Sequence, residues 1–142
     1  MNELDMLAGL VRKHSSGAPA SFPPCAFYDD RLDCIRVISR DCSVIEDRLN
    51  SRITVLVDAH RSRRDEPEGL EYVGFTIKGA WHFCQERGLA PGTIKMTTLL
   101  DALLKAYPDV VVRLFVEHVA KPIVEQKKID QVDIREAVTA PA

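Results

Sequence analysis

Four short runs rich in valine and isoleucine lie between residues 32 and 77, and they constrain the fold more than any other feature. They cover residues 32–38, 44–49, 53–58 and 72–77. β-Branched side chains suit the pleated, half-buried surface of a sheet, so each run is expected to form a strand. The breaks at Arg40-Asp41 and Asn50-Ser51 are too short for the crossover that joins parallel strands. The sequence therefore predicts an antiparallel meander.

The chain of 142 residues is long enough for one domain with its own core and too short for two. A helix is expected over residues 1–14, where apolar residues recur at helical spacing. The meander is expected over residues 26–78 and a helical region over residues 79–136. The prediction is an α+β fold: an antiparallel β-meander of four to five strands with N-terminal and C-terminal helices packed on it.

Start and stop signals divide the expected helical region. Gly88 suits the C-terminal cap of a first helix. A second helix is expected to begin at Thr97 or Thr98, and Asp101, three residues after Thr98, imitates a capping box. Asp109 is expected to cap a third helix that Pro122 interrupts. Apolar residues between positions 123 and 134 are expected to extend a final, charged helix.

Alternation along the expected strands sorts their side chains onto two faces. One face is apolar, and Phe75 is expected to be buried on it between Val73 and Ile77. The other, the mixed face, combines charged and apolar residues. Its expected members are Arg36, Ile38, Val44, Glu46, Arg48, Leu56 and Tyr72.

The composition excludes several classes of protein. A net charge of −2 gives no general attraction to nucleic acid or to anionic membranes. No apolar run approaches the roughly 20 residues that a membrane span requires. The acidic N-terminus lacks the basic region of a secretory signal, so a cytoplasmic location is expected. The four cysteines match no Cys-x-x-Cys pattern and are expected to be free thiols that pack as small apolar side chains.

Candidate chemistry is sparse. His82 and Cys84, with His60 or Cys34, are of the types that bind zinc, but positions i and i+2 of a helix face different directions. Nothing in the sequence places a general base beside Cys84, as a nucleophile would need. No catalytic residue, metal site or cofactor is therefore predicted, and a small enzyme is only the third hypothesis for function.

Three aspartates form an acidic corner at positions 29, 30 and 33. Carboxylates that cluster at a turn usually accept hydrogen bonds from backbone amides, which is the role expected for them here.

Arg61, Arg63 and Arg64 form the sharpest cluster of charge. Their guanidinium groups could bind phosphate, nucleic acid or an acidic partner. Asp65 and Glu66 follow at once, however, and these carboxylates weaken any local field. A solvated loop is the preferred interpretation, and a nucleic-acid or phosphate-binding module is the alternative hypothesis for function.

The first hypothesis is a non-catalytic interaction or scaffold domain that acts as a homodimer. The two C-terminal helices carry more apolar surface than one sheet face needs, and the charges of the mixed face would be costly to bury. Pairing with a second copy resolves that conflict. The expected oligomer contacts are Leu103, Leu114 and Phe115.

The four runs also resemble a family of small bacterial proteins of unknown function. The resemblance rests on the Tyr28-Asp29 opening, on Asp33, and on the closing strand with Val73-Gly74-Phe75. It covers about residues 27–83 and implies a short meander followed by a small helix. An arginine-rich insert before the glycine strand and long flanking helical segments depart from the family pattern. The resemblance implies no catalytic residues.

Overall fold

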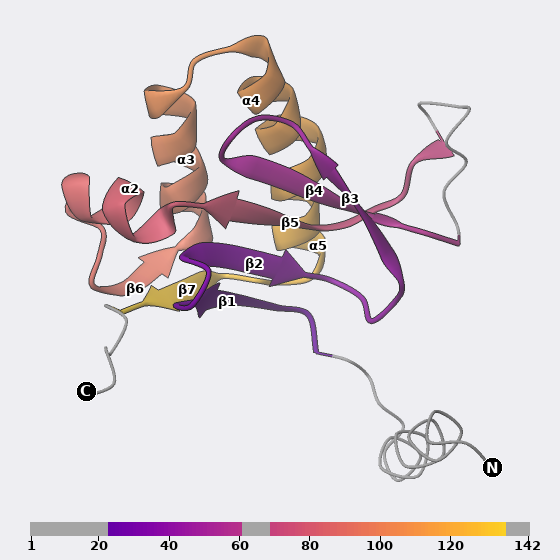
Figure 1. Cartoon of the computed structure of the whole chain (residues 1–142), viewed down its shortest axis with the longest axis horizontal. Coiled ribbons are helices and arrows are strands. Elements are labelled where there is room, and N and C mark those ends of the chain that lie inside the picture. The colour runs from indigo at the N-terminus through magenta and orange to yellow at the C-terminus, as the bar shows by residue number, and fades with distance from the viewer. Residues whose placement is uncertain (1–22, 61–68, 136–142) are drawn as a thin grey trace, which may run out of the picture.

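The computed structural model describes residues 23–60 and 69–135 (Figure 1). The helix predicted over residues 1–14 and the cluster Arg61, Arg63 and Arg64 lie outside the described residues. The main sheet contains β1 (Cys25–Asp29), β2 (Cys34–Ile38), β3 (Val44–Arg48), β4 (Ile53–Asp58) and β5 (Tyr72–Lys78). It is followed by α2 (Ala80–Glu86), β6 (Gly92–Lys95), α3 (Met96–Ala106), α4 (Val110–Phe115), the π-helical turn η2 (Val116–Ala120), α5 (Lys121–Gln126) and β7 (Gln131–Ile134).

The main sheet has the strand order β1-β2-β5-β4-β3, and every neighbouring pair is antiparallel. The predicted α+β class and antiparallel sheet are confirmed. The expected pairing of β2 with β3 is wrong, because β5 inserts between the two hairpins and takes the centre. Burial explains the order: β4 is buried along its whole length and β5 along most of it, whereas β3 is mostly exposed. An exposed, charged strand suits a sheet edge.

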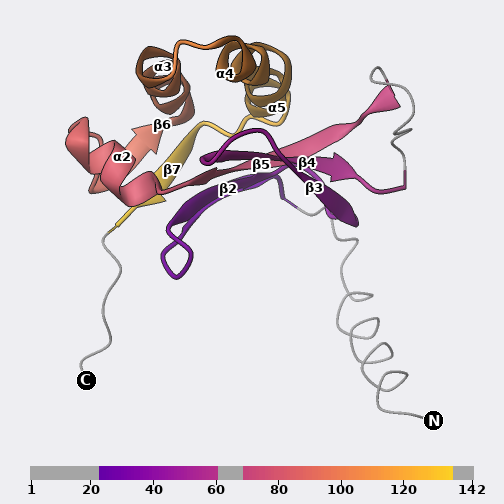
Figure 2. The same cartoon turned by 45° about the horizontal axis from the view of Figure 1, so that its top comes forward.

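One face of the sheet carries the helices, as Figure 2 shows. The core forms there, with sheet residues such as Val37, Val55 and Phe75 packed against helix residues such as Leu100 and Phe115. The C-terminal helices, which were predicted to pack on the sheet without a face being assigned, therefore pack on its apolar face. The predicted burial of Phe75 is also confirmed: its exposed fraction is 0%, and its ring meets that of Phe115 edge-on at a centroid distance of 5.1 Å.

A β-bulge shifts the pairing of β4 with β5. Leu56 pairs with Gly74, but Val57 pairs with Tyr72, so one residue of β5 is passed over. The extra residue turns Tyr72 toward the helices, where it packs against the core. Its expected place on the mixed face is therefore wrong, since simple alternation does not hold across a bulge.

The C-terminal end of α2 and the beginning of α3 test two capping predictions. Beyond α2, the Gly88 N–H donates to Gln85 O at 3.0 Å and the next amide donates to Cys84 O at 2.8 Å, so the predicted cap is confirmed. The predicted start of α3 at Thr97 or Thr98 is wrong, because the helix begins at Met96 without a side-chain cap. The Met96 N–H instead donates to the Asp130 carbonyl oxygen at 2.8 Å.

The long C-terminal helix begins as predicted, with the Asp109 carboxylate accepting from the Val112 N–H at 2.9 Å. Pro122 does not end it, because α4, η2 and α5 follow one another without a gap. The Lys121 N–H donates to Val116 O, five residues back, which marks the widened π turn. Proline has no N–H and clashes with the carbonyl four residues earlier, so a widened turn before it keeps the helix continuous.

The predicted final helix to residue 134 is wrong in its second half. Residues 131–134 form β7, which pairs with β6 as a small antiparallel sheet. Val132 and Ile134 are buried while Gln131 and Asp133 are exposed, and a period of two residues is typical of a strand. The helical region expected over residues 79–136 is also interrupted by β6, which begins at Gly92.

Candidate functional site

Apolar side chains are exposed on α4. Val110 is 57% exposed, Val111 46% and Leu114 48%. They recur at positions i, i+1 and i+4 of one helix, so they form a continuous stripe, which we call the α4 surface. Contiguous exposed apolar patches mark interaction sites more often than single exposed residues do.

A groove of about 310 Å³ lies beside the α4 surface. Leu49 and Tyr72 line it on the sheet side, and Val111 and Leu114 line it on the helix side. His118, exposed one turn further along the helix, is its main polar neighbour. The surface thus combines protruding apolar side chains with an apolar hollow next to them.

The three residues predicted as oligomer contacts divide between the core and this surface. Leu103 is 0% exposed and Phe115 2% exposed, since both pack on the sheet. Only Leu114 remains accessible to another molecule. The apolar side of α3 is buried within the protomer. Exposed apolar surface was expected on both C-terminal helices, but it is found on one side of α4.

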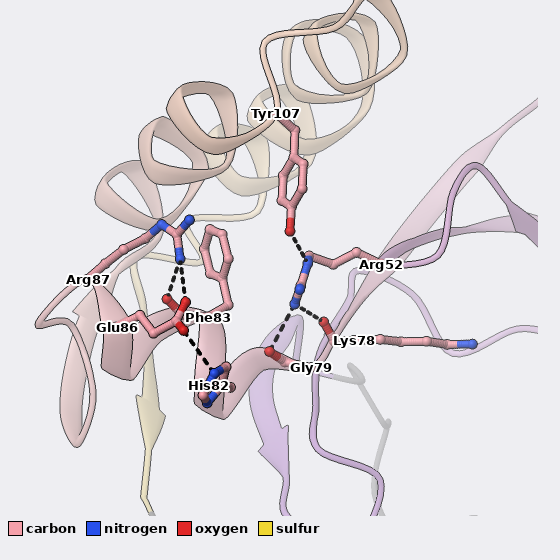
Figure 3. A network of polar contacts seen from close by, with 8 residues as sticks. All are labelled: Arg52, Lys78, Gly79, His82, Phe83, Glu86, Arg87 and Tyr107. Carbon is pink, nitrogen blue, oxygen red and sulfur yellow. Dashed lines mark hydrogen bonds and ion pairs between the residues drawn. The ribbon is translucent and has the colours of Figure 1, made fainter.

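A cluster around Arg52 joins three segments that are far apart in the chain (Figure 3). Its Nε donates to the Tyr107 hydroxyl at 2.8 Å, and its Nη1 donates to the carbonyl oxygens of Lys78 at 2.7 Å and Gly79 at 2.9 Å. The guanidinium also lies 5.2 Å from the centroid of the Phe83 ring. All of these partners are groups of the same chain. The cluster therefore has a structural role, because it connects the β3–β4 turn, the start of α2 and the end of α3.

The candidate metal and nucleophile residues are not brought together. His82 is exposed and its Nε2 lies 2.9 Å from Glu86 Oε1, whereas Cys84 is buried in the core. Among residues 23–60 and 69–135, no three His, Cys, Asp or Glu side chains gather closely enough to hold a metal ion. The structure therefore gives these residues packing and surface roles.

All four cysteines are free, as predicted. Burial raises the pKa of the Cys84 thiol to about 11. Burial also raises the pKa of Cys34 and Cys42, with neighbouring carboxylates adding to the effect. A nucleophilic cysteine needs a lowered pKa, and these three environments do the opposite.

The rates at which the cysteines are alkylated should differ according to their burial and pKa. With iodoacetamide at pH 8, Cys84 and Cys34 should react far more slowly than Cys25, which is half-buried. A rise of the pKa from 9.0 to about 11 lowers the thiolate fraction of Cys84 by about a hundredfold at this pH, and its rate should still be rising above pH 9. Peptide mass spectrometry measures the rates, with the unfolded protein as control. Equal rates for Cys84 and Cys25 in the folded protein would contradict the prediction.

Two aspartates of the acidic corner, Asp29 and Asp33, have the role predicted for them. The Asp29 carboxylate accepts from the Arg31 N–H at 3.0 Å. The Asp33 carboxylate accepts from the Trp81 N–H at 2.8 Å, at the start of α2, and from the Tyr28 hydroxyl at 2.6 Å. Burial and this bond to Asp33 raise the pKa of the Tyr28 hydroxyl. These carboxylates therefore hold the β1–β2 turn against α2.

Comparison with family models, with curated proteins and with solved structures finds no match for this chain. The resemblance seen in residues 27–83 therefore carries no argument about function. The part of the chain that the structure describes contains no helix with the length and hydropathy to cross a membrane. The hypothesis of a nucleic-acid or phosphate site at Arg61, Arg63 and Arg64 concerns residues outside the described ranges and stays a prediction.

Proposed function

We propose that this chain is a non-catalytic protein-interaction domain that forms a homodimer through the α4 surface. The observation that carries the proposal is the half-exposed stripe of Val110, Val111 and Leu114 beside an apolar groove. A two-fold interface uses the same patch on both subunits, so that patch must be complementary to itself. A protrusion and a hollow side by side meet this requirement, because each copy can place Leu114 in the groove of the other.

Charges beside the stripe support the same arrangement. Arg113 and Glu117 are exposed and lie one turn apart, on either side of Leu114 in the sequence. If two copies pair with their α4 helices antiparallel, Arg113 of each copy comes close to Glu117 of the other. A stable interface buries about 1,200–2,000 Å² in total, so the groove walls formed by Leu49 and Tyr72 would also be covered.

Leu114→Asp is the test. The variant should change the mass in light scattering from dimer to monomer, because a charge in an apolar contact has no partner. Circular dichroism should stay unchanged, since Leu114 is 48% exposed in the protomer. Leu32→Asp, at a residue 65% exposed in the β1–β2 turn, is the matched control and should leave the mass unchanged.

Two outcomes would refute the proposal. One is an unmodified protein that is monomeric at high micromolar concentration. The other is a Leu114→Asp variant that remains dimeric with a folded sheet.

A further inference from the structure

The mixed face of the sheet contains a hollow of about 370 Å³, on the side away from the described helices. Five charged or hydroxyl side chains line it, together with Leu32 and Cys34: Arg36, Glu46, Thr54, Thr76 and Lys78. This hollow shares no lining residue with the groove beside the α4 surface.

Strand register brings three of these side chains into one row. Arg36 of β2 pairs with Thr76 of β5, and Thr76 pairs with Thr54 of β4. Directly paired residues project from the same face with their Cβ atoms about 4.5–5.5 Å apart. Lys78 follows Thr76 by two residues and therefore projects from that face as well. A guanidinium, two hydroxyls and an ammonium group thus belong to side chains that line the same hollow.

Arg36 has unused hydrogen-bonding capacity. Its side chain is only 29% exposed, and its Nε is enclosed without an acceptor among the described residues. The carboxylate paired with it, Glu46 Oε1, lies 3.9 Å from Nη2, which is longer than a hydrogen bond. An enclosed N–H without an acceptor is costly, and the long ion pair leaves Nη2 free to donate to a closer partner, so a ligand that supplies oxygen acceptors would be stabilised beside Arg36.

The charges around the hollow favour an anion. Arg36 and Lys78 are opposed by one carboxylate in the lining, that of Glu46, which is 64% exposed on the edge strand. The next carboxylate, Asp29, pairs with Cys34 across the β1–β2 ladder. It already accepts from the Arg31 N–H of its own turn. The balance in the hollow is therefore positive.

We propose that this part of the mixed face binds a small oxyanion, either a phosphate or a carboxylate group. Arg36 presents a planar fork of donors that matches both groups. Lys78 adds a second positive charge, and the hydroxyls of Thr54 and Thr76 are further donors. Glu46 competes with the anion for Arg36.

The experiment is an NMR titration of the ¹⁵N-labelled full chain with inorganic phosphate and, separately, with acetate. Saturable shifts are expected at the amides of Arg36, Thr54 and Thr76. Arg36→Gln should weaken binding about tenfold or more, because hydrogen bonds to charged groups are lost. Glu46→Gln should tighten binding several-fold, since it removes the competing carboxylate. Lys105→Gln, at an exposed residue of α3 in the helix layer, is the matched control and should leave anion binding unchanged.

The two anions distinguish the ligand class, since the tighter one identifies phosphate or carboxylate as the preferred group. Shifts that grow linearly without saturation for both anions would overturn the proposal, as would unchanged binding in Arg36→Gln. If Arg36→Gln fails to fold, Lys78→Gln and Glu46→Gln decide: the first should weaken binding and the second should strengthen it. The proposal is overturned if both variants change the affinity for the anion in the same direction, or if neither changes it.

Discussion

Replacing Phe75 by alanine is expected to lower the free energy of unfolding by about 3–5 kcal/mol. The side chain is 0% exposed at the centre of the sheet, so its removal loses transfer free energy and leaves a cavity. It also loses the edge-on contact with Phe115 at 5.1 Å. Urea unfolding followed by circular dichroism measures the change.

Phe27→Ala is the matched control, because this phenylalanine lies on the edge strand β1 and is 41% exposed. It should cost about 1 kcal/mol or less, as substitutions near the surface usually do. An unchanged unfolding midpoint for Phe75→Ala would mean that the apolar face is assigned to the wrong side of the sheet.

Gly74→Ala is expected to destabilise the protein by about 3 kcal/mol or more, at the upper end of the range for overpacking. A Cβ at this position would lie 2.2 Å from the Val37 carbonyl oxygen and 3.2 Å from Leu56 Cδ1. The Val37 carbonyl oxygen belongs to the backbone of β2, so the clash can be relieved only if β2 and β5 move apart.

Gly88→Ala is the comparison for this variant. There a Cβ would meet nothing within 4 Å, but φ is +70°, a conformation that costs about 1–2 kcal/mol for a residue with a side chain. The unfolding midpoint of Gly74→Ala should therefore be clearly lower. A smaller effect at Gly74 than at Gly88 would contradict the close approach of β2 to β5.

Local patterns predicted most of the elements. The valine- and isoleucine-rich runs gave the strands, because β-branched residues and short breaks act over a few residues. Asp109 and Gly88 marked helix ends because their contacts lie within one turn. The burial of Phe75 followed from alternation, because the bulge of β5 falls at Val73 and leaves the pairing of Phe75 with Val55 regular.

The errors arose where distant parts of the chain decide the structure. The place of β5 at the centre depends on its burial by helices that follow it. The start of α3 depends on the Asp130 carbonyl, 34 positions after Met96, which takes the role given to Thr98. Residues 131–134 contain two buried apolar positions, and so short a pattern fits a strand or a helix until its partner β6 is known.

The candidate sites show the same limit. The apolar spacing of Leu103, Leu114 and Phe115 placed them on helices, but it could not tell which of them are buried in the core. Leu114 is exposed because it lies on another side of α4 than Val112 and Phe115, the residues of this helix that are buried in the core. Arg36 and Glu46 were both expected on the mixed face, yet their approach depends on side chains reaching across two intervening strands, which no local pattern indicates.

The central place of β5 also affects the chain while it is being made. The hairpins β1–β2 and β3–β4 leave the ribosome first, each with an inner edge, β2 or β4, that has no strand to pair with until β5 arrives. Unpaired edges pair readily with other chains, so this interval carries a risk of aggregation. The helices that cover the apolar face come later still. A nascent chain therefore exposes the inner edges of β2 and β4 after residue 58 has left the ribosome and until residue 78 has left it as well.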